Sequence, residues 1–246
     1  MTPIRIFVAI GISVMPLIAG ALSLEQTPLF IASTEPRVML VASRDHQLSM
    51  KAYTDYSDLD GDGALDTTYK DSFAYYGYFD SEKCYTYSSG VFSPSAAVNA
   101  GTHQCGGSTW SGNFLNWASM TRMDILRKTF YGGYRSTDTT TKTVLERHFL
   151  PFDVHAFVKV YTPTGSMPSI QSLTGISGQT SISLCNVSMS NSSTLTGQMT
   201  TLPDPTIRVA SGRWPQWDSS EVTQCALSGG TQPTAVLADY AARVEV

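Results

Sequence analysis

Four aspartates lie within nine residues of the stretch SDLDGDGALDTTY, which runs from Ser57 to Tyr69. Carboxylates this close repel one another, and a hard divalent cation removes the repulsion by taking their oxygens as ligands. Calcium binds about six to eight oxygens, and a short loop can supply them from every second residue. The pattern therefore predicts a structural calcium loop, whose ligands are Asp58, Asp60, Asp62, the carbonyl of Ala64 and Asp66, the last directly or through water.

The predicted loop has the form DxDxDGxxD and differs from an EF-hand. Gly63 stands where the chain must turn sharply, because glycine accepts positive φ. Leu65 is apolar and is expected to anchor the loop to a core. Tyr69 occupies position 12, where an EF-hand has a bidentate glutamate, and no clear helical pattern flanks the loop. A polar Asp/Gly turn without metal is the alternative.

No complete catalytic set can be recognised in the sequence. GxSxG, HExxH, GxxxxGK[ST] and GxGxxG segments are absent. Asp45, His46 and Ser49 carry suitable groups, but three neighbours in sequence seldom converge as a triad. We therefore expect a protein that is not an enzyme.

The four cysteines are Cys84, Cys105, Cys185 and Cys225. Three pairings are possible, and sequence proximity favours Cys84–Cys105 and Cys185–Cys225. Each such bridge stabilises a fold by roughly 3–4 kcal/mol in the chain-entropy account. Zinc is the less favoured alternative, because there is no CxxC pair and the four histidines are not at ligand spacing around the cysteines.

Residues 1–23 have the pattern of a signal peptide. Arg5 precedes an apolar run that ends in Ala19-Gly20-Ala21, a small-x-small cleavage signature. An uncleaved membrane anchor is the alternative, although Gly11 and Pro16 disfavour a stable span. Export to an oxidising compartment agrees with the even number of cysteines. Only 15% of residues are charged and the net charge is −4, which gives no basic footprint for nucleic acid.

The elements that would position these groups are mostly strands. Residues 36–43, 155–163, 181–185, 206–211 and 238–246 have apolar or alternating patterns typical of strands, and the aromatic run 73–92 favours strands that pack on a core over an exposed sticky surface. Residues 87–109 are expected to be a loop. One helix is predicted from Ser111 or Asn113 to Gly132-Gly133, with Phe114, Leu115, Ala118, Ile125, Leu126 and Phe130 on one stripe. A single convincing helix among strands favours an α+β fold stabilised by disulfides.

Five segments resemble the N-terminal region of the PilC/PilY family of type IV pilus assembly and tip-associated adhesin proteins. They are SDLDGDGALDTTYKDSFAYYGYFDSEKCYTY, WSGNFLNWASMTRMDILRKTFYGGYRSTDT, TVLERHFLP, LCNVS and IRVASGRWPQW. The most specific part is SGNFLNW-x-x-MTRMD. The resemblance implies that residues 24–246 form a PilC/PilY-like N-terminal domain. Family members are usually longer and carry a C-terminal β-propeller, so we expect a domain truncated at its C-terminus.

The resemblance also implies a function and a location. We expect an exported, non-enzymatic protein of pilus assembly, twitching motility and surface adhesion, located at the cell surface, pilus or outer membrane, or in the periplasm. Its expected partners are pilus components or pilins and a host or abiotic surface, with no nucleic acid and no stable membrane span after signal cleavage. The alternatives are a secreted calcium-stabilised carbohydrate-binding module or hydrolase, and a non-functional gene fragment.

Some family members have an N-terminal region similar to a von Willebrand factor A domain, an α/β core that would here carry long Ser/Thr/Gly-rich insertions. Such domains bind metal through a DxSxS motif after the first strand. Asp45 and Ser49 occupy the first and last places of that motif, but Gln47 replaces the middle serine. We therefore predict no metal at this second motif.

Overall fold

The computed structural model describes residues 39, 41, 45–150, 155–188, 204–219, 224–226 and 232–246. The chain divides into two units, Met1–Ser43 and Arg44–Val246, and the fold described below is that of the second. The predicted signal peptide lies outside the described residues. Of the predicted strand 36–43, only Met39 and Val41 are described, and both are exposed and outside any strand. The prediction of a buried strand is therefore wrong at these two residues.

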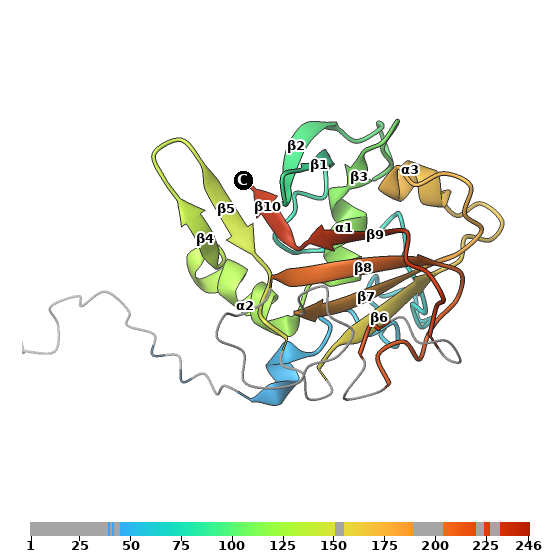
Figure 1. Ribbon diagram of the computed structural model, residues 1–246, viewed down its shortest axis with the longest axis horizontal. Coiled ribbons are helices and arrows are strands. Elements are labelled where there is room, and N and C mark those ends of the chain that lie inside the picture. Colours follow the sequence, from blue (N-terminus) through green and yellow to red (C-terminus); the bar gives the residue numbers. More distant parts are fainter. Residues whose placement is uncertain are drawn as a thin grey trace, which may run out of the picture. The chain divides into compact units, whose positions relative to one another are not determined.

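Among the described residues, the strands form a six-stranded sheet in the order β3-β1-β2-β10-β5-β4 and a four-stranded sheet in the order β6-β7-β8-β9 (Figure 1). The elements in chain order are the 3-10 helix η1 (His46–Ser49), β1 (Lys83–Ser88), β2 (Val91–Ala97), β3 (Trp110–Ser111), α1 (Gly112–Ser119), α2 (Arg122–Tyr131), β4 (Arg135–Asp138), β5 (Thr143–Glu146), β6 (Phe157–Tyr161), α3 (Ile170–Thr174), β7 (Ile182–Ser188), β8 (Pro205–Ser211), β9 (Ala238–Ala241) and β10 (Arg243–Glu245).

The C-terminal segment joins the two sheets. β9 pairs with β8 of the four-stranded sheet, and after Ala242 the chain continues as β10, which lies between β2 and β5 of the six-stranded sheet. One hydrophobic core serves both sheets and α1. It contains Phe92 and Val244 from the larger sheet, Leu184 and Val209 from the smaller, and Phe114 from α1. The two sheets and α1 thus share one apolar interior.

The predicted single helix is two helices. α1 ends at Ser119, Met120 is extended with ψ 141°, and Thr121 caps α2. Thr121 and Asp124 form a capping box, in which each side chain accepts a hydrogen bond from the other residue's backbone N–H. Of the predicted apolar stripe, the three residues in α1 are buried, whereas in α2 Ile125 packs against the core only partly buried and Phe130 is 55% exposed. A single helical period does not run through Met120 and Thr121, because the capping residues interrupt the helix there.

Two further predictions about loops and strands need correction. Residues 87–109 contain β2, which pairs with β1 through a two-residue turn at Ser89 and Gly90, both with positive φ. The aromatic residues 73–79 form no strand, although Tyr75, Tyr78 and Phe79 are buried as expected.

The predicted strands at 155–163, 181–185, 206–211 and 238–246 are confirmed as β6, β7, β8 and the pair β9–β10. A mixed α/β fold with few helices is also confirmed. A von Willebrand factor A-like core is not confirmed: in the described sheets only β2 and β10 pair in parallel.

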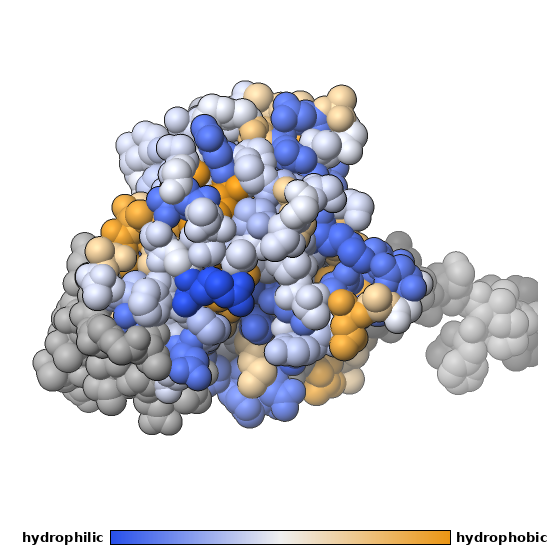
Figure 2. Space-filling model, turned by 90° about the vertical axis from the view of Figure 1, so that its right-hand side faces the viewer, coloured by the Kyte–Doolittle hydropathy of each residue, from blue (hydrophilic) through white to orange (hydrophobic). Residues whose placement is uncertain are grey.

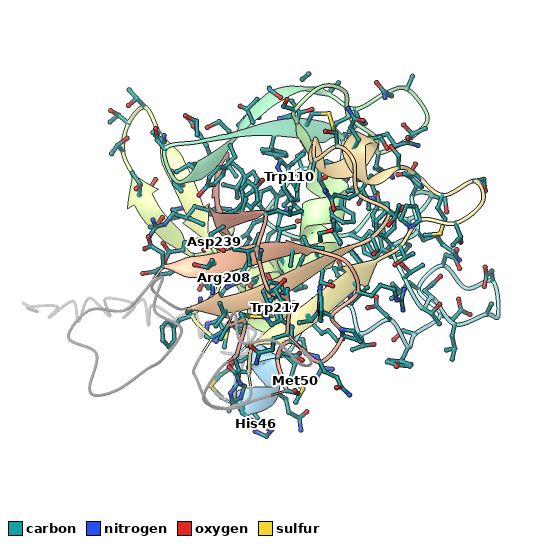
Figure 3. All side chains as sticks on the ribbon, turned by 45° about the vertical axis from the view of Figure 1, so that its right-hand side comes forward. His46, Met50, Trp110, Arg208, Trp217 and Asp239 are labelled. Atoms are coloured by element: carbon teal, nitrogen blue, oxygen red, sulfur yellow. A yellow bond between two sulfur atoms is a disulfide. The ribbon has the colours of Figure 1, made fainter. Side chains whose placement is uncertain are left out.

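Both predicted disulfides, Cys84–Cys105 and Cys185–Cys225, are present. The second lies in a smaller core that contains Trp217, seen near the centre of Figure 3. Close by, Arg208 of β8 forms two hydrogen bonds to the carboxylate of Asp239 in β9, at 2.8 and 2.9 Å. None of the described helices is long and apolar enough to cross a membrane. On the face shown in Figure 2 the hydrophobic residues lie in small patches among hydrophilic ones.

Candidate metal site

The acidic loop is a tight turn built around Asp58. A β-bridge closes it, with Asp66 N–H donating to the carbonyl of Ser57 at 2.9 Å. The carboxylate of Asp58 accepts hydrogen bonds from the backbone N–H groups of Gly61, Asp62 and Gly63, at 2.7, 3.1 and 2.9 Å. Gly61 and Gly63 have φ of 75° and 85°, which residues with a Cβ rarely adopt. The two glycines are thus required by the curvature of the loop.

Three of the predicted ligands converge. One carboxylate oxygen from each of Asp58, Asp60 and Asp66 can be chosen so that all lie within 4.8 Å of one another, and this cluster can hold a metal ion. Asp62 is outside this group. Ala64 donates its N–H to Asp62 at 2.8 Å, and the role of its carbonyl as a ligand stays a prediction.

Lys70 supplies a positive charge that the sequence prediction overlooked. Its ammonium lies 2.6 Å from Asp60, 3.1 Å from Asp62 and 2.8 Å from Asp66. These hydrogen bonds raise the pKa of Lys70, and the Lys70 ammonium is the main cause of the lowered pKa of Asp66. The pKa of Asp62 is also lowered, mainly because its carboxylate accepts a hydrogen bond from the N–H of Ala64. The sequence signal for this ion pair is the position of Lys70, four residues after Asp66.

The loop is anchored to the core differently from the prediction. Leu65, expected to be the anchor, is 62% exposed, whereas Leu59 packs against the main core. Tyr69 is buried and contacts the rings of Phe114, Trp117 and Tyr161. The departure from an EF-hand at position 12 therefore has a structural reason, because the ring of Tyr69 fixes the end of the loop in the core.

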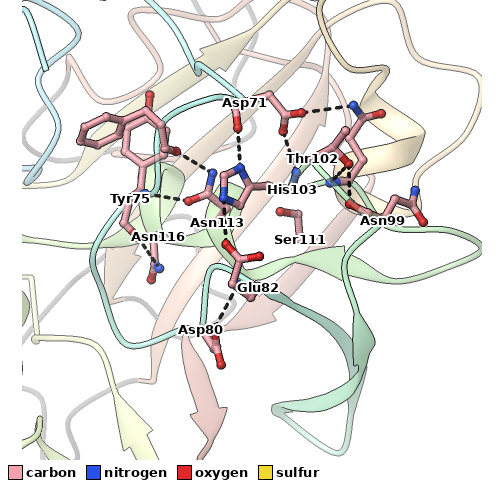
Figure 4. A network of polar contacts seen from close by, with 12 residues as sticks. Asp71, Tyr75, Asp80, Glu82, Asn99, Thr102, His103, Ser111, Asn113 and Asn116 are labelled. Atoms are coloured by element: carbon pink, nitrogen blue, oxygen red, sulfur yellow. Dashed lines mark hydrogen bonds and ion pairs between the residues drawn. The ribbon is translucent and has the colours of Figure 1, made fainter. Parts of the chain in front are cut away.

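Two buried asparagines of α1 hold the irregular aromatic segment that follows the loop. Asn113 accepts from Tyr75 N–H at 2.7 Å (Figure 4) and donates to the carbonyl of Phe73 at 2.9 Å. Asn116 accepts from Phe79 N–H at 3.0 Å and donates to the carbonyls of Tyr75 and Phe79, both at 2.8 Å. These amides replace the hydrogen bonds that a strand ladder would supply.

His103 ties the same region to the first disulfide loop. Its Nε2 lies 3.2 Å from the carboxylate of Glu82, its backbone N–H donates to Asp71, and its Nδ1 contacts the carbonyl of Asp71 (Figure 4). The neighbouring Gln104 also donates to Asp71, at 3.2 Å. Cys105 follows directly, so the disulfide and this network constrain the same turn of the chain.

Asp45 and Ser49, the residues of the degenerate DxSxS motif, make structural contacts within the fold. Asp45 accepts from Gln47 N–H at 3.2 Å and so caps η1, and it also contacts His46 at 2.8 Å. The hydroxyl of Ser49 lies 3.0 Å from Nε2 of His148, a residue far along the chain. The trio considered from sequence is therefore not assembled as Asp45–His46–Ser49, because the histidine that Ser49 contacts is His148.

Comparison with known proteins identifies relatives of this chain. The family model described as "PilY1 homolog, small alpha/beta domain" matches residues 66–210, more than half of the chain. A type IV pilus biogenesis factor PilY1 homolog of Xylella fastidiosa is 46% identical over 124 residues, which are 50% of this chain and 8% of that protein. A second protein of the same name and organism is 42% identical over 93 residues, 34% of this chain and 8% of its own length.

The chain spans only a small part of these curated relatives. The matched family range begins at Asp66, so Asp58, Asp60 and Asp62 lie before it. No solved structure matches.

Proposed function

The chain belongs to the PilY1 homolog family, and we propose that it is an exported, non-enzymatic protein of type IV pilus assembly. The match over residues 66–210 carries this proposal, and the names of the two relatives support it. The two disulfides support export, because such bridges persist in oxidising compartments. Twitching motility and surface adhesion, through contacts with pilins and with a host or abiotic surface, are part of the proposal.

The proposal includes calcium in the acidic loop. Oxygen ligands alone, from Asp58, Asp60 and Asp66, suit a hard cation better than zinc or copper. The N–H groups directed at Asp58 hold its carboxylate in place before any ion binds. When bound, calcium would neutralise the aspartates and fix the chain that leads into the aromatic segment.

The pilus role is tested by clean deletion of the coding region in the source bacterium. We expect fewer surface pili and reduced twitching and attachment, restored by the wild-type gene. Complementation with the double variant Asp58→Asn, Asp60→Asn tests the loop, and Asp138→Asn, an exposed carboxylate in β4, is the matched control. Normal piliation, motility and attachment in the deletion strain would contradict the proposal.

Calcium binding is tested separately by calorimetry on the oxidised chain after chelation. We expect one site and a rise in melting temperature on adding calcium, because a ligand that binds only the folded state stabilises it. Asp60→Asn and Asp66→Asn should each weaken binding by about tenfold or more, equivalent to about 1.4 kcal/mol. A protein that gives no binding heat and melts identically with and without chelator has no calcium site.

A further inference from the structure

A cavity of about 530 Å³ lies beside the edge strand β6, and none of its lining residues belongs to the aspartate cluster. This volume is within the range of about 300–1,000 Å³ typical of small-molecule sites. Its walls come from distant parts of the chain, including residues 51–56, residues 158–164 of β6 and the following turn, and Arg213 after β8. The tertiary fold, and no single sequence motif, creates this cavity.

The charged groups in the lining favour an anionic ligand. Lys51 and Arg213 are cations, and Asp55 is the only carboxylate among the described lining residues. The carboxylate of Asp55 is already engaged, since the buried ammonium of Lys159 lies 2.7 and 2.8 Å from its two oxygens. Trp117 also donates its indole N–H to Asp55 at 2.9 Å. The cavity therefore has an excess of positive charge in a protein whose net charge is −4.

The uncharged lining favours a ligand rich in hydroxyl groups. Five threonines, whose hydroxyls can donate and accept hydrogen bonds, line the cavity: Thr54, Thr67, Thr68, Thr162 and Thr164. Arg213 donates to the hydroxyl of Thr162 at 2.8 Å, which orients the guanidinium and leaves further N–H donors for a ligand. Tyr56 also lines the cavity and is 77% exposed, so its ring is accessible for stacking on a sugar face.

We propose that this cavity binds a carboxylate-bearing saccharide, such as a uronic acid unit of an acidic polysaccharide. Arg213 and Lys51 bind the carboxylate, the threonines bind the hydroxyls, and the ring of Tyr56 packs on the apolar face of the sugar. A neutral sugar leaves the two cations without a partner, and a simple anion leaves the threonines and Tyr56 unused. The site shares Thr67 and Thr68 with the end of the acidic stretch but none of the clustered aspartates, and it binds its ligand with or without calcium.

The test is calorimetric titration of the full, oxidised chain with tetragalacturonate, with maltotetraose as the neutral match and tetraglutamate as the acidic match that lacks sugar. Chelator is present throughout, because polyuronates bind calcium themselves. We expect binding of tetragalacturonate at least about tenfold tighter than of either comparison ligand, a difference of about 1.4 kcal/mol.

Variants assign the binding to the cavity. Arg213→Ala and Tyr56→Ala should each weaken tetragalacturonate binding by fivefold or more without changing the melting temperature. Arg135→Ala and Tyr131→Ala remove an arginine and an exposed tyrosine outside the cavity and should leave binding unchanged. No tetragalacturonate binding, equal binding of tetraglutamate, equal binding of maltotetraose, or equal loss in the control variants would each overturn the proposal.

Discussion

Lys70 shows how an acidic loop can fold without a bound metal. Its ammonium contacts three carboxylates, so the repulsion that first suggested a cation is already relieved by the chain itself. Asp60 and Asp66, two of the three members of the candidate metal cluster, are among its partners. The proposed calcium ion would therefore have to displace the ammonium, and we expect Lys70 to set the balance between the metal-free and metal-bound loop.

Replacing Lys70 should shift this balance toward calcium. In Lys70→Ala we expect a lower melting temperature in chelator and a calcium affinity raised by about tenfold, equivalent to about 1.4 kcal/mol, because no ammonium has to leave. Lys83→Ala, which removes another partly exposed lysine paired with an aspartate, is the control. Calorimetry and thermal melts measure both effects, and an unchanged or lower calcium affinity in Lys70→Ala would show that the ammonium does not compete.

Lys159 and Asp55 form the most deeply buried ion pair among the described residues. The Lys159 side chain is fully buried, and its ammonium also lies 4.4 Å from the centre of the Trp117 ring. Burial lowers the pKa of Lys159 to about 8, against the opposing effect of Asp55. Asp55 itself has φ 64°, a conformation that asparagine and aspartate tolerate better than most residues.

The lowered pKa predicts a pH dependence of stability. Lysine in an unfolded chain has a pKa of about 10.4, so between about pH 8 and pH 10 the unfolded state holds more protons than the folded state. Stability should therefore rise with pH over this interval, by about 2 kcal/mol between pH 7.5 and 9.5. Urea unfolding at several pH values measures the rise, which Lys159→Met should abolish. A persistent rise in that variant would assign it to another group.

The same pair predicts coupling between two substitutions. Lys159→Met should cost about 3 kcal/mol at pH 7, because it leaves a mostly buried carboxylate without its partner. The double variant with Asp55→Asn should lose clearly less than the sum of the single losses. Additive losses would mean that the two groups stabilise the fold independently.

Asn113 and Asn116 of α1 form a clamp on residues 73–79, and this clamp explains why these aromatic residues need no strand. Asn113 and Asn116 satisfy the backbone, and Gly77 allows the close approach, since a Cβ there would lie 2.1 Å from Oδ1 of Asn116. The motif SGNFLNW could be recognised in the sequence as specific. In the sequence Asn113 is a candidate helix cap and Asn116 has no assigned role, because nothing local indicates which distant backbone the two amides bind.

Removing one of the two asparagine side chains of this clamp should destabilise the whole unit. Asn116→Ala leaves buried backbone groups of Tyr75 and Phe79 unpaired, and we expect a loss of about 2–4 kcal/mol in chemical unfolding. Asn99→Ala, at an exposed asparagine, should change stability by less than about 0.5 kcal/mol. Equal small effects in both variants would show that water replaces the clamp at little cost.

The two sheets are held together by segments far apart in the chain. β10 pairs with β2 and β5, while β9, separated from β10 only by Ala242, completes the other sheet. The disulfides act at separate places: Cys84–Cys105 joins β1 to the loop before α1, and Cys185–Cys225 secures the residues beside Trp217. Cross-links of this kind restrict the unfolded chain more as the closed loop lengthens.

Removing the bridges should therefore have unequal effects. The chain-entropy relation gives about 3 kcal/mol for the first bridge and about 4 kcal/mol for the second, whose cysteines are 40 residues apart. Paired Cys→Ser variants, followed by thermal and urea unfolding, measure each loss. A larger loss for the Cys84–Cys105 pair would show that native packing around that bridge outweighs loop length.

The sequence by itself predicted the strands β6, β7, β8 and β9–β10, favoured the disulfide pairing that is present and placed the three clustered aspartates in one short loop, because each depends on local spacing, composition or proximity along the chain. Only the tertiary structure decided that Lys70 shares the acidic loop, that Ser49 meets His148, that two asparagines replace a strand ladder, and that Lys51 and Arg213 line one cavity. These contacts join residues that are distant in the chain and meet only once the core has formed. They therefore produce no periodic pattern that could be recognised in a single sequence.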